Sequence, residues 1–173
     1  MKFVGFLRGI NVGGHRKILM KDLKSTMAQL KFENIQTYIQ SGNVVFDAHY
    51  REPTVEHLLE KQIKADFGFE VPITLFKKDE FIEGISSNPL RSNEQTSYVV
   101  FLKTPPEQIA IDQLMKMNFE NDELTINNRF IYLNLSKPFH KSKLNLAFFE
   151  KSLGVNATIR NQKTCDKILS MLD

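Results

Sequence analysis

The sequence predicts an α+β fold built from two tandem ferredoxin-like halves, each with the element order βαββαβ, followed by a C-terminal helix. Short β-prone runs alternate with segments whose apolar residues recur at helical spacing. The order strand, helix, strand, strand, helix, strand is complete before residue 79 and begins again after residue 96. The chain has 173 residues, 42% hydrophobic and 25% charged, which is ordinary for a globular protein of one large or two small domains.

The first half opens with Phe3–Leu7, which predicts a buried strand because a glycine-rich segment bounds it. Apolar residues between positions 20 and 30 recur every three or four residues, so they share one face of a helix. The runs Ile35–Gln40 and Val44–Asp47 predict a hairpin, since Ser41-Gly42-Asn43 between them can supply the positive φ that a tight turn requires.

A second helix and a fourth strand complete this half. Pro53 suits the first turn of a helix, and apolar residues from Val55 to Phe67 line one of its faces. Gly68 is a natural helix stop. Val71–Phe76 then predicts a strand, in which Pro72 favours an edge position or the first residues.

The second half repeats the order. Tyr98–Leu102 predicts a strand, and Pro105-Pro106 opens a helix. Two strands flank a turn at Asn127-Asn128. Ser142 is expected to cap a helix that ends near Gly154.

A short strand, Ala157–Ile159, and a C-terminal helix close the chain. Cys165, Ile168 and Leu172 lie on one apolar stripe of that helix. The predicted organisation is a first ferredoxin-like half at 1–78, a linker with a short helix at 79–96, and a second half with the C-terminal helix at 97–173.

Composition argues against several classes of protein. Net charge is +3 and the pI is near 8.9, whereas dedicated nucleic-acid binders concentrate far more positive charge on one face. Cys165 is the single cysteine, so no internal disulfide framework can form, which fits a reducing compartment. No apolar run approaches the roughly 18 residues that span a bilayer. We therefore expect a cytoplasmic protein with no membrane partner.

The first candidate site is the glycine-rich loop Arg8–Gly14, followed by His15-Arg16-Lys17. Backbone N–H groups of such a turn can converge on an anion, and the dipole of the next helix would assist. Gly9 and Gly14 have the spacing of a phosphate-binding P-loop, but His15-Arg16 stand where that motif requires Lys and then Ser or Thr. The alternative is a tight glycine-dependent turn with solvated basic side chains.

Two further polar segments are candidates. The turn at Tyr38–Asn43 offers Gln, Ser and Asn side chains that could hydrogen-bond a ligand. The alternative is that these residues are present only because they suit the geometry of the hairpin turn. Near the C terminus, beside the cluster His140–Lys143, Arg160 can clamp a carboxylate or phosphate, and Asn161 suits the N-cap of the last helix. The alternative there is capping plus surface charge. The sequence does not show whether the turn lies beside the first loop.

Other reactive side chains form no recognisable site. The four histidines show no metal-ligand spacing among themselves or with Cys165, so no metal site is predicted. Cys165 is expected to pack in the core rather than to act as a nucleophile, because it lies on an apolar stripe. The sequence identifies no catalytic residue and no cofactor, and it leaves open whether the protein is an enzyme.

Several motifs combine into a pattern that spans the chain. They are Arg8–Gly14 with Met20 and Leu23, Thr37–Phe46, Asn88-Pro89, Ser142-Lys143-Leu144, and Thr158 to Thr164 with Arg160-Asn161. Together they resemble the domain-of-unknown-function 1697 family of bacterial proteins. The chain departs from the family pattern at Gln162, where relatives often carry an aromatic residue, and at Pro138–His140, where a glycine-containing turn is common.

The resemblance implies two similar α+β halves and no established activity. The family's signature falls mostly on polar and glycine residues at element ends, where sites are usually built. These positions are Arg8, Gly9, Asn11, Gly13, Gly14, Gln40, Ser41, Gly42, Asn43, Lys143, Arg160 and Asn161.

We therefore predict that the protein binds a small anionic or phosphorylated ligand, held by the glycine-rich loop. The predicted ligand-binding residues are Arg8, Gly9, Asn11, Gly13, Gly14, Ser41, Asn43, Lys143, Arg160 and Asn161. One alternative is an RNA- or DNA-binding module, because ferredoxin-like sheets can present aromatic side chains to bases. The other is a non-catalytic interaction or regulatory protein. The sequence gives no indication of oligomeric state.

Overall fold

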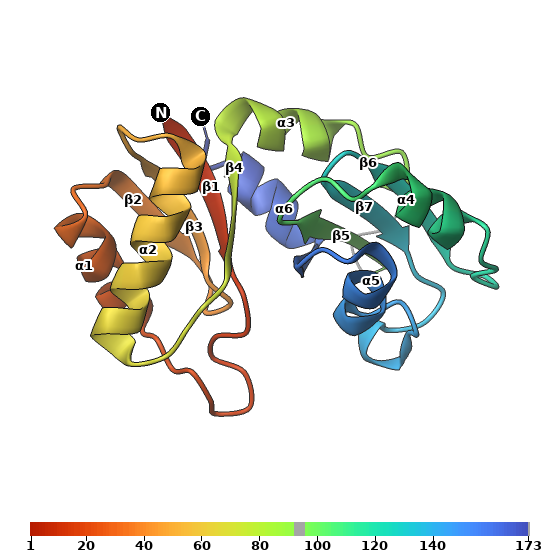
Figure 1. Ribbon diagram of the computed structural model, residues 1–173, viewed down its shortest axis with the longest axis horizontal. Coiled ribbons are helices and arrows are strands. Elements are labelled where there is room, and N and C mark those ends of the chain that lie inside the picture. Colours follow the sequence, from red (N-terminus) through yellow and green to blue (C-terminus); the bar gives the residue numbers. More distant parts are fainter. Residues whose placement is uncertain (92–95, 173) are drawn as a thin grey trace. The chain divides into compact units, whose positions relative to one another are not determined.

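The computed structural model describes residues 1–91 and 96–172 (Figure 1). Within them the fold is α+β, with two four-stranded antiparallel sheets and six α-helices. The chain divides into two compact units. Unit 1 contains Met1–Ile82 together with the C-terminal residues from Ile168 onwards, and unit 2 contains Glu83–Lys167.

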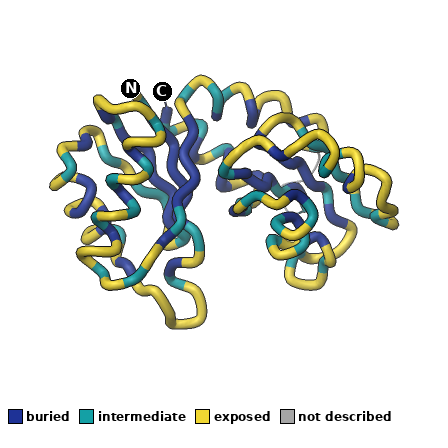
Figure 2. The backbone as a smooth tube through the Cα atoms, viewed as in Figure 1, coloured by how far each residue is buried: buried dark blue, intermediate teal, exposed yellow. Residues whose placement is uncertain are grey.

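Unit 1 holds the first sheet, whose strand order is β2-β3-β1-β4. Its elements are β1 (Lys2–Leu7), α1 (Met20–Gln29), β2 (Glu33–Tyr38), β3 (Asn43–Asp47), α2 (Glu52–Phe67) and β4 (Ile73–Lys77). The central strand β1 pairs with both β3 and β4, so that Gly5 lies opposite Val44 on one side and Leu75 on the other. The first strand of the sequence is therefore an inner strand of its sheet, and its residues from Phe3 to Leu7 are buried (Figure 2).

The core of unit 1 lies between this sheet and helices α1 and α2. Phe3 and Leu7 of β1 pack there with Leu23 and Met27 of α1 and Leu59 of α2, all nearly inaccessible to solvent. Burial of such side chains is the main favourable contribution to folding. The core therefore fixes the end of β1, from which the glycine-rich loop departs.

Several helix boundaries follow local sequence signals. Gly68 ends α2 in the left-handed conformation, with φ of 80°, as predicted. Helix α3 (Lys78–Ser86) lies in the segment expected to hold a short helix. The residues 92–95 of the expected linker lie outside the described part of the chain.

Unit 2 holds the second sheet, with strand order β6-β7-β5-β8. Its elements are β5 (Ser97–Leu102), α4 (Gln108–Met115), β6 (Glu123–Asn127), β7 (Phe130–Asn134), a 3₁₀ turn (Phe139–Lys141), α5 (Leu146–Leu153), β8 (Ala157–Asn161) and α6 (Gln162–Leu169). The core beneath this sheet includes Val100, Leu114, Ile131, Leu133 and Phe149. Each unit thus places its first strand at an inner position between its third and fourth strands.

Two helix starts in unit 2 differ from the sequence prediction. Helix α4 begins at Gln108 rather than at Pro105-Pro106. The prediction that Ser142 caps α5 is wrong, because Asn145 is the N-cap and its Oδ1 accepts from the Phe148 N–H at 3.0 Å. The Ser142 hydroxyl instead accepts from the Leu144 N–H at 3.0 Å. Serine and asparagine are equally good caps, so propensity could not choose between the two positions.

The end of α3 packs tightly within unit 2. The hydroxyl of Tyr132 donates to the Gly84 carbonyl at 2.7 Å. A Cβ at Gly84 would overlap the ring of Phe130, so glycine is required by close approach. In the described residues, no helix has the length and apolar character needed to cross a membrane.

Candidate functional site

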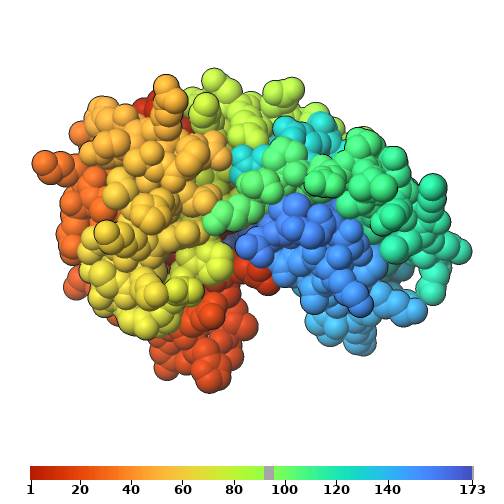
Figure 3. All heavy atoms as spheres, viewed as in Figure 1, coloured from red at the N-terminus to blue at the C-terminus, as the bar shows by residue number. Residues whose placement is uncertain are grey.

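The glycine-rich loop after β1 is a small protruding hairpin (Figure 3). Gly13 and Gly14 have φ of 58° and 77°, and the His15 N–H donates to the Val12 carbonyl at 3.0 Å. Positive φ at both central residues is the mark of a type I′ turn. Helix α1 begins only at Met20, so its N-terminal dipole does not act at the two glycines.

Asn11 closes the base of this hairpin. Its Nδ2 donates to the Ile18 carbonyl at 2.9 Å and to the Gln40 carbonyl at 2.8 Å, and its Oδ1 accepts from the Ile18 N–H at 2.9 Å. Both hydrogens of the side-chain amide are therefore used inside the protein. Its φ of 55° lies in the left-handed region, which asparagine tolerates better than most residues. These contacts give Asn11 a clear structural role.

The turn between β2 and β3 lies directly against the start of this loop. The Leu7 N–H donates to the Gly42 carbonyl at 2.8 Å. A Cβ at Gly42 would lie 2.7 Å from Leu7 Cβ and 2.8 Å from Ile10 Cδ1, and Gly42 has φ of 79°. The two N-terminal motifs, whose relative position the sequence left open, therefore form one structure.

The buried side chain of Asn43 stiffens the turn. Its Nδ2 donates to the Tyr38 carbonyl at 2.9 Å and to the Ser41 hydroxyl at 3.0 Å. Both predicted binding residues of the turn thus take part in its internal hydrogen bonding. Such local bonds are a common way for Asn and Ser to fix a turn.

Residues 8–19 and 39–42 together form a surface that we call the N-terminal loop surface. It exposes three aliphatic side chains, Val12 at 67%, Leu19 at 65% and Ile39 at 49%. Arg8, Arg16 and Lys17 are cationic, and neither segment contains an acidic residue. The surface is therefore both apolar and positively charged.

Two features at the start of this surface restrain the backbone. The Arg8 N–H donates to the Pro72 carbonyl at 3.0 Å, which holds the half-buried Arg8 next to the strand end. Gly9 has φ of 69°, and a Cβ there would lie 3.5 Å from Arg16 Nη1. The Arg16 guanidinium therefore lies back over the Gly9 backbone.

The predicted C-terminal residues lie on unit 2. Arg160, on β8, donates through Nη1 to the Thr158 hydroxyl at 2.9 Å and to the Ile159 carbonyl at 2.8 Å. Burial lowers the pKa of Arg160 to about 10, so the guanidinium still carries its charge at neutral pH. Asn161 accepts from the Thr164 N–H at 2.9 Å, which confirms it as the N-cap of α6.

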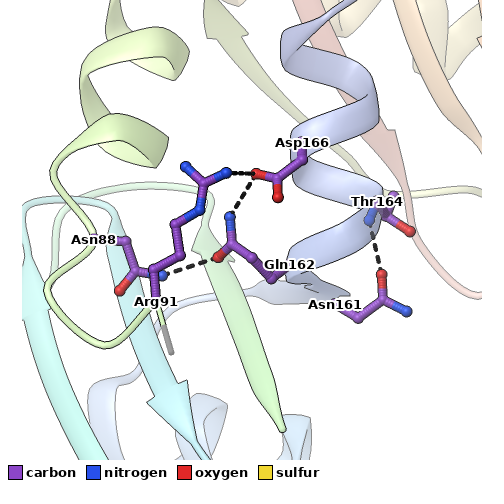
Figure 4. A network of polar contacts seen from close by, with 6 residues as sticks. All are labelled: Asn88, Arg91, Asn161, Gln162, Thr164 and Asp166. Carbon is purple, nitrogen blue, oxygen red and sulfur yellow. Dashed lines mark hydrogen bonds and ion pairs between the residues drawn. The ribbon is translucent and has the colours of Figure 1, made fainter. Parts of the chain in front are cut away.

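A polar network with a buried centre at Asn88 and Gln162 joins the segment after α3 to helix α6 (Figure 4). Asn88 Nδ2 donates to Gln162 Oε1 at 2.9 Å, and Gln162 Nε2 donates to Asp166 Oδ1 at 2.8 Å. Arg91 pairs with the same Asp166 oxygen at 2.9 Å. Both the oxygen and the nitrogen of the Gln162 amide therefore have a hydrogen-bond partner. This gives a physical reason for glutamine at a position where relatives often carry an aromatic residue.

Lys143 borders a hollow of about 190 Å³ in unit 2. The hollow lies between the connection from α4 to β6 and the segment that leads from β7 into α5. Its walls combine aromatic and aliphatic side chains with hydroxyl, lysine and carboxylate groups. The lining residues are Met117, Asn118, Phe119, Glu120, Asp122, Ser136, Lys137, Lys141, Ser142, Lys143, Leu144 and Phe148.

The apolar wall of this hollow is ordered by packing. Phe119 and Phe148 meet edge to face, with ring centroids 6.5 Å apart and planes at 86°. Leu144 is buried in the core beside them. Aromatic contacts of this kind hold the wall in a defined geometry.

The charges around the hollow are unequally matched. Asp122 Oδ1 accepts from the Ser136 N–H at 2.7 Å and from its hydroxyl at 2.8 Å. Lys143 Nζ lies 3.9 Å from Glu120 Oε1, which is a loose, exposed pair. Within the described part of the chain, Lys137 and Lys141 have no acidic partner. The three lysines therefore exceed the two carboxylates by one positive charge.

Sequence reasoning found one side of this hollow, the segment Ser142–Leu144, and missed the other. The sequence from Met117 to Asp122 contains no motif from which its contact with residues about twenty positions later could be predicted. Only packing within unit 2 brings the two segments together.

Cys165 lies in the core, as predicted, with no exposed surface. Burial raises the pKa of its thiol well above the ordinary value, so the nucleophilic thiolate is disfavoured. Among residues 1–91 and 96–172, no three His, Cys, Asp or Glu side chains gather as metal ligands would.

Comparison with known proteins identifies a family and a similar solved structure. No curated protein matches it. The solved structure of the conserved bacterial protein SP0830 from Streptococcus pneumoniae is similar, with a TM-score of 0.78 and 25% sequence identity over 99% of this chain and 98% of that one. The family model "Protein of unknown function (DUF1697)" matches residues 1–132, a range that includes both N-terminal motifs. Since this match covers most of the sequence, the chain belongs to the DUF1697 family of proteins of unknown function.

Proposed function

We propose that this protein binds a small organic anion and that the hollow beside Lys143 is the binding site. The observation that carries the proposal is the arrangement of Lys137, Lys141 and Lys143 around an apolar wall, with an excess of positive charge. Ligand sites are commonly apolar hollows with a few polar groups that orient the ligand. Lysine ammonium groups pair readily with carboxylates and phosphates.

This proposal retains the anionic ligand predicted from the sequence and moves its main contact from the glycine-rich loop to the hollow. The type I′ geometry accounts for Gly13 and Gly14, and internal hydrogen bonds occupy the amide donors of Asn11. Binding at Arg8, Gly9, Ser41, Asn43, Arg160 and Asn161 stays a prediction, as does a cytoplasmic location.

Thermal-shift and calorimetric titration with inorganic phosphate, benzoate and phenyl phosphate would test the proposal. Ligand at about 100 times its Kd should stabilise the protein by roughly 2.7 kcal/mol. The double variant Lys141→Gln with Lys143→Gln should lose this stabilisation, whereas Lys61→Gln, an exposed lysine of α2, should retain it. A flat response to all three anions, or equal binding by the double variant, would overturn the proposal.

A second candidate function is docking to a protein partner through the N-terminal loop surface. The observation that favours it is the exposure of Val12, Leu19 and Ile39 on a surface that also carries three basic side chains. Large exposed apolar residues with a polar rim are typical of interaction sites. The expected partner carries acidic side chains next to an apolar contact.

Comparative capture would test this second function. The native chain and the paired variant Val12→Asp with Ile39→Asp would be immobilised and exposed to the same bacterial extract. A partner retained by the native chain, released by salt and absent from the variant would support docking. Identical capture by both chains would exclude the loop surface as the contact.

We also propose that each unit is ferredoxin-like. The order βαββαβ and a sheet with the first strand between the third and fourth support this description in both units. The nucleic-acid alternative has weaker support, because base stacking needs exposed rings. Among the described residues, the one aromatic side chain that is strongly exposed to solvent is Tyr50, with 49% of its surface accessible.

A further inference from the structure

A second hollow adjoins the one beside Lys143. It measures about 370 Å³ and is lined by Gln113, Leu114, Met117, Phe148, Lys151 and Ser152. Met117 and Phe148 line both hollows. The two spaces therefore share one apolar partition between helices α4 and α5.

The two hollows differ in volume, and this difference suggests which part of a ligand each could hold. The first, at about 190 Å³, is smaller than the roughly 300–1,000 Å³ of ordinary ligand pockets, so it suits a compact head group. The second, at about 370 Å³, falls within that range by itself. A ligand of ordinary size that places its anionic head at the lysines can extend its remaining atoms past Met117 and Phe148 into the second hollow.

The chemistry of the second hollow favours an apolar extension. Its apolar part is formed by Leu114, Met117 and Phe148, beside the polar side chains of Gln113 and Ser152. Its charged lining residue is the cation Lys151, so a cationic tail finds no counter-charge there. Leu114 belongs to the core, and Phe148 packs partly against it. Met117 is 47% exposed, and methionine has a flexible side chain that readily reshapes around a ligand.

From these features we infer that the ligand is an amphiphilic anion, with a carboxylate or phosphate head at the lysines and an alkyl or aryl tail over Met117 and Phe148. The inference rests on the proposed function and adds the class of ligand to it. The lysines supply charge recognition, and the partition supplies apolar contact. Affinity should therefore depend on tail length as well as on head charge.

A series of alkyl carboxylates gives a direct test. Calorimetric titration would compare butanoate, hexanoate and octanoate below their micellar concentrations, with octanol and octyltrimethylammonium as head-group controls. Each methylene that becomes buried should tighten binding about fourfold. The neutral and cationic octyl compounds should bind much more weakly than octanoate.

A matched pair of variants locates the tail. Met117→Ser removes part of the partition and should reduce the gain per methylene while butanoate still binds. Met115→Ser serves as the control, because Met115 is similarly exposed at 45% and lines neither hollow. Circular dichroism and thermal denaturation of both variants would verify that they remain folded.

The possible outcomes distinguish failure of the amphiphilic ligand from failure of the anion site itself. If every carboxylate binds equally through Lys141 and Lys143, the anion site stands and the amphiphilic ligand is overturned. If octanol binds as tightly as octanoate, or if both methionine variants act alike, the inference is also overturned. If no anion binds at all, the proposed function itself fails.

Discussion

The side-chain amide of Asn11 donates to the main-chain carbonyl of Gln40 at 2.8 Å, across 29 positions of sequence. This bond joins the hairpin after β1 to the turn between β2 and β3. The Leu7 N–H supplies a parallel connection to the Gly42 carbonyl. The two motifs that distinguish the N-terminal half therefore stabilise each other.

Replacing Asn11 by alanine should destabilise unit 1 by about 1–3 kcal/mol. The change removes three hydrogen bonds and leaves the Ile18 N–H without its acceptor. Urea denaturation followed by circular dichroism would measure the loss. Asn11→Asp is a useful comparison, because it keeps the acceptor for Ile18 and removes both donors. A change below about 0.3 kcal/mol in Asn11→Ala would mean that the loop is held by other contacts.

Gly42→Ala should cost more stability than Gly14→Ala. Both glycines have φ near 80°, which costs an L-residue about 1–2 kcal/mol. Gly42 also faces Leu7 and Ile10 closely, and such overpacking adds about 1–3 kcal/mol. An added Cβ at Gly14 would meet nothing within 4 Å. Equal midpoints of denaturation for the two variants would show that crowding at Gly42 is relieved without cost.

Ile39→Asn should change stability by less than about 0.5 kcal/mol, because relief of backbone strain offsets the lost apolar burial. Ile39 has φ of 48°, which is rare for a β-branched residue. Ile35→Asn, in strand β2 and packed against the core, should instead cost about 1–3 kcal/mol. The comparison by urea denaturation would show whether Ile39 is retained for reasons other than stability. Similar losses in both variants would contradict this.

Local signals predicted much of the fold, and long-range contacts limited the rest. Gly68 and Asn161 end and begin helices through bonds to residues a few positions away, so short sequence windows sufficed. Gly42 must be glycine partly because Leu7 and Ile10 lie too close for a Cβ. Both residues are more than thirty positions earlier, so a short sequence window around Gly42 does not include them. The same reason applies to the proposed binding site. Lys143 was predicted from its own segment, whereas the wall around Phe119 joins it only in the folded unit.

Alkaline pH should destabilise the native chain more than the Cys165→Ala variant. Burial raises the pKa of the Cys165 thiol, so the folded protein keeps its proton while the unfolded chain loses it near the ordinary pKa of 9.0. The unfolded state then binds fewer protons, and stability falls above pH 9 by up to about 1.4 kcal/mol per pH unit. Below pH 8 this contribution is fully present.

Urea denaturation of both chains between pH 8 and pH 10 would reveal the difference in slope. Reaction with a thiol reagent at pH 8 offers a second readout, since the buried thiol should react only as the protein unfolds. Parallel stability curves for the two chains, or rapid thiol modification of the folded protein, would contradict the prediction.

The division of the chain into units has a consequence for its synthesis. Residues from Ile168 onwards belong to unit 1, and the Lys78 ammonium donates to the Leu172 carbonyl at 2.7 Å. All of unit 2 must therefore leave the ribosome before unit 1 can acquire its last contacts. The first unit to begin folding during synthesis is therefore the last to be completed, because its final contacts come from residues made after Lys167.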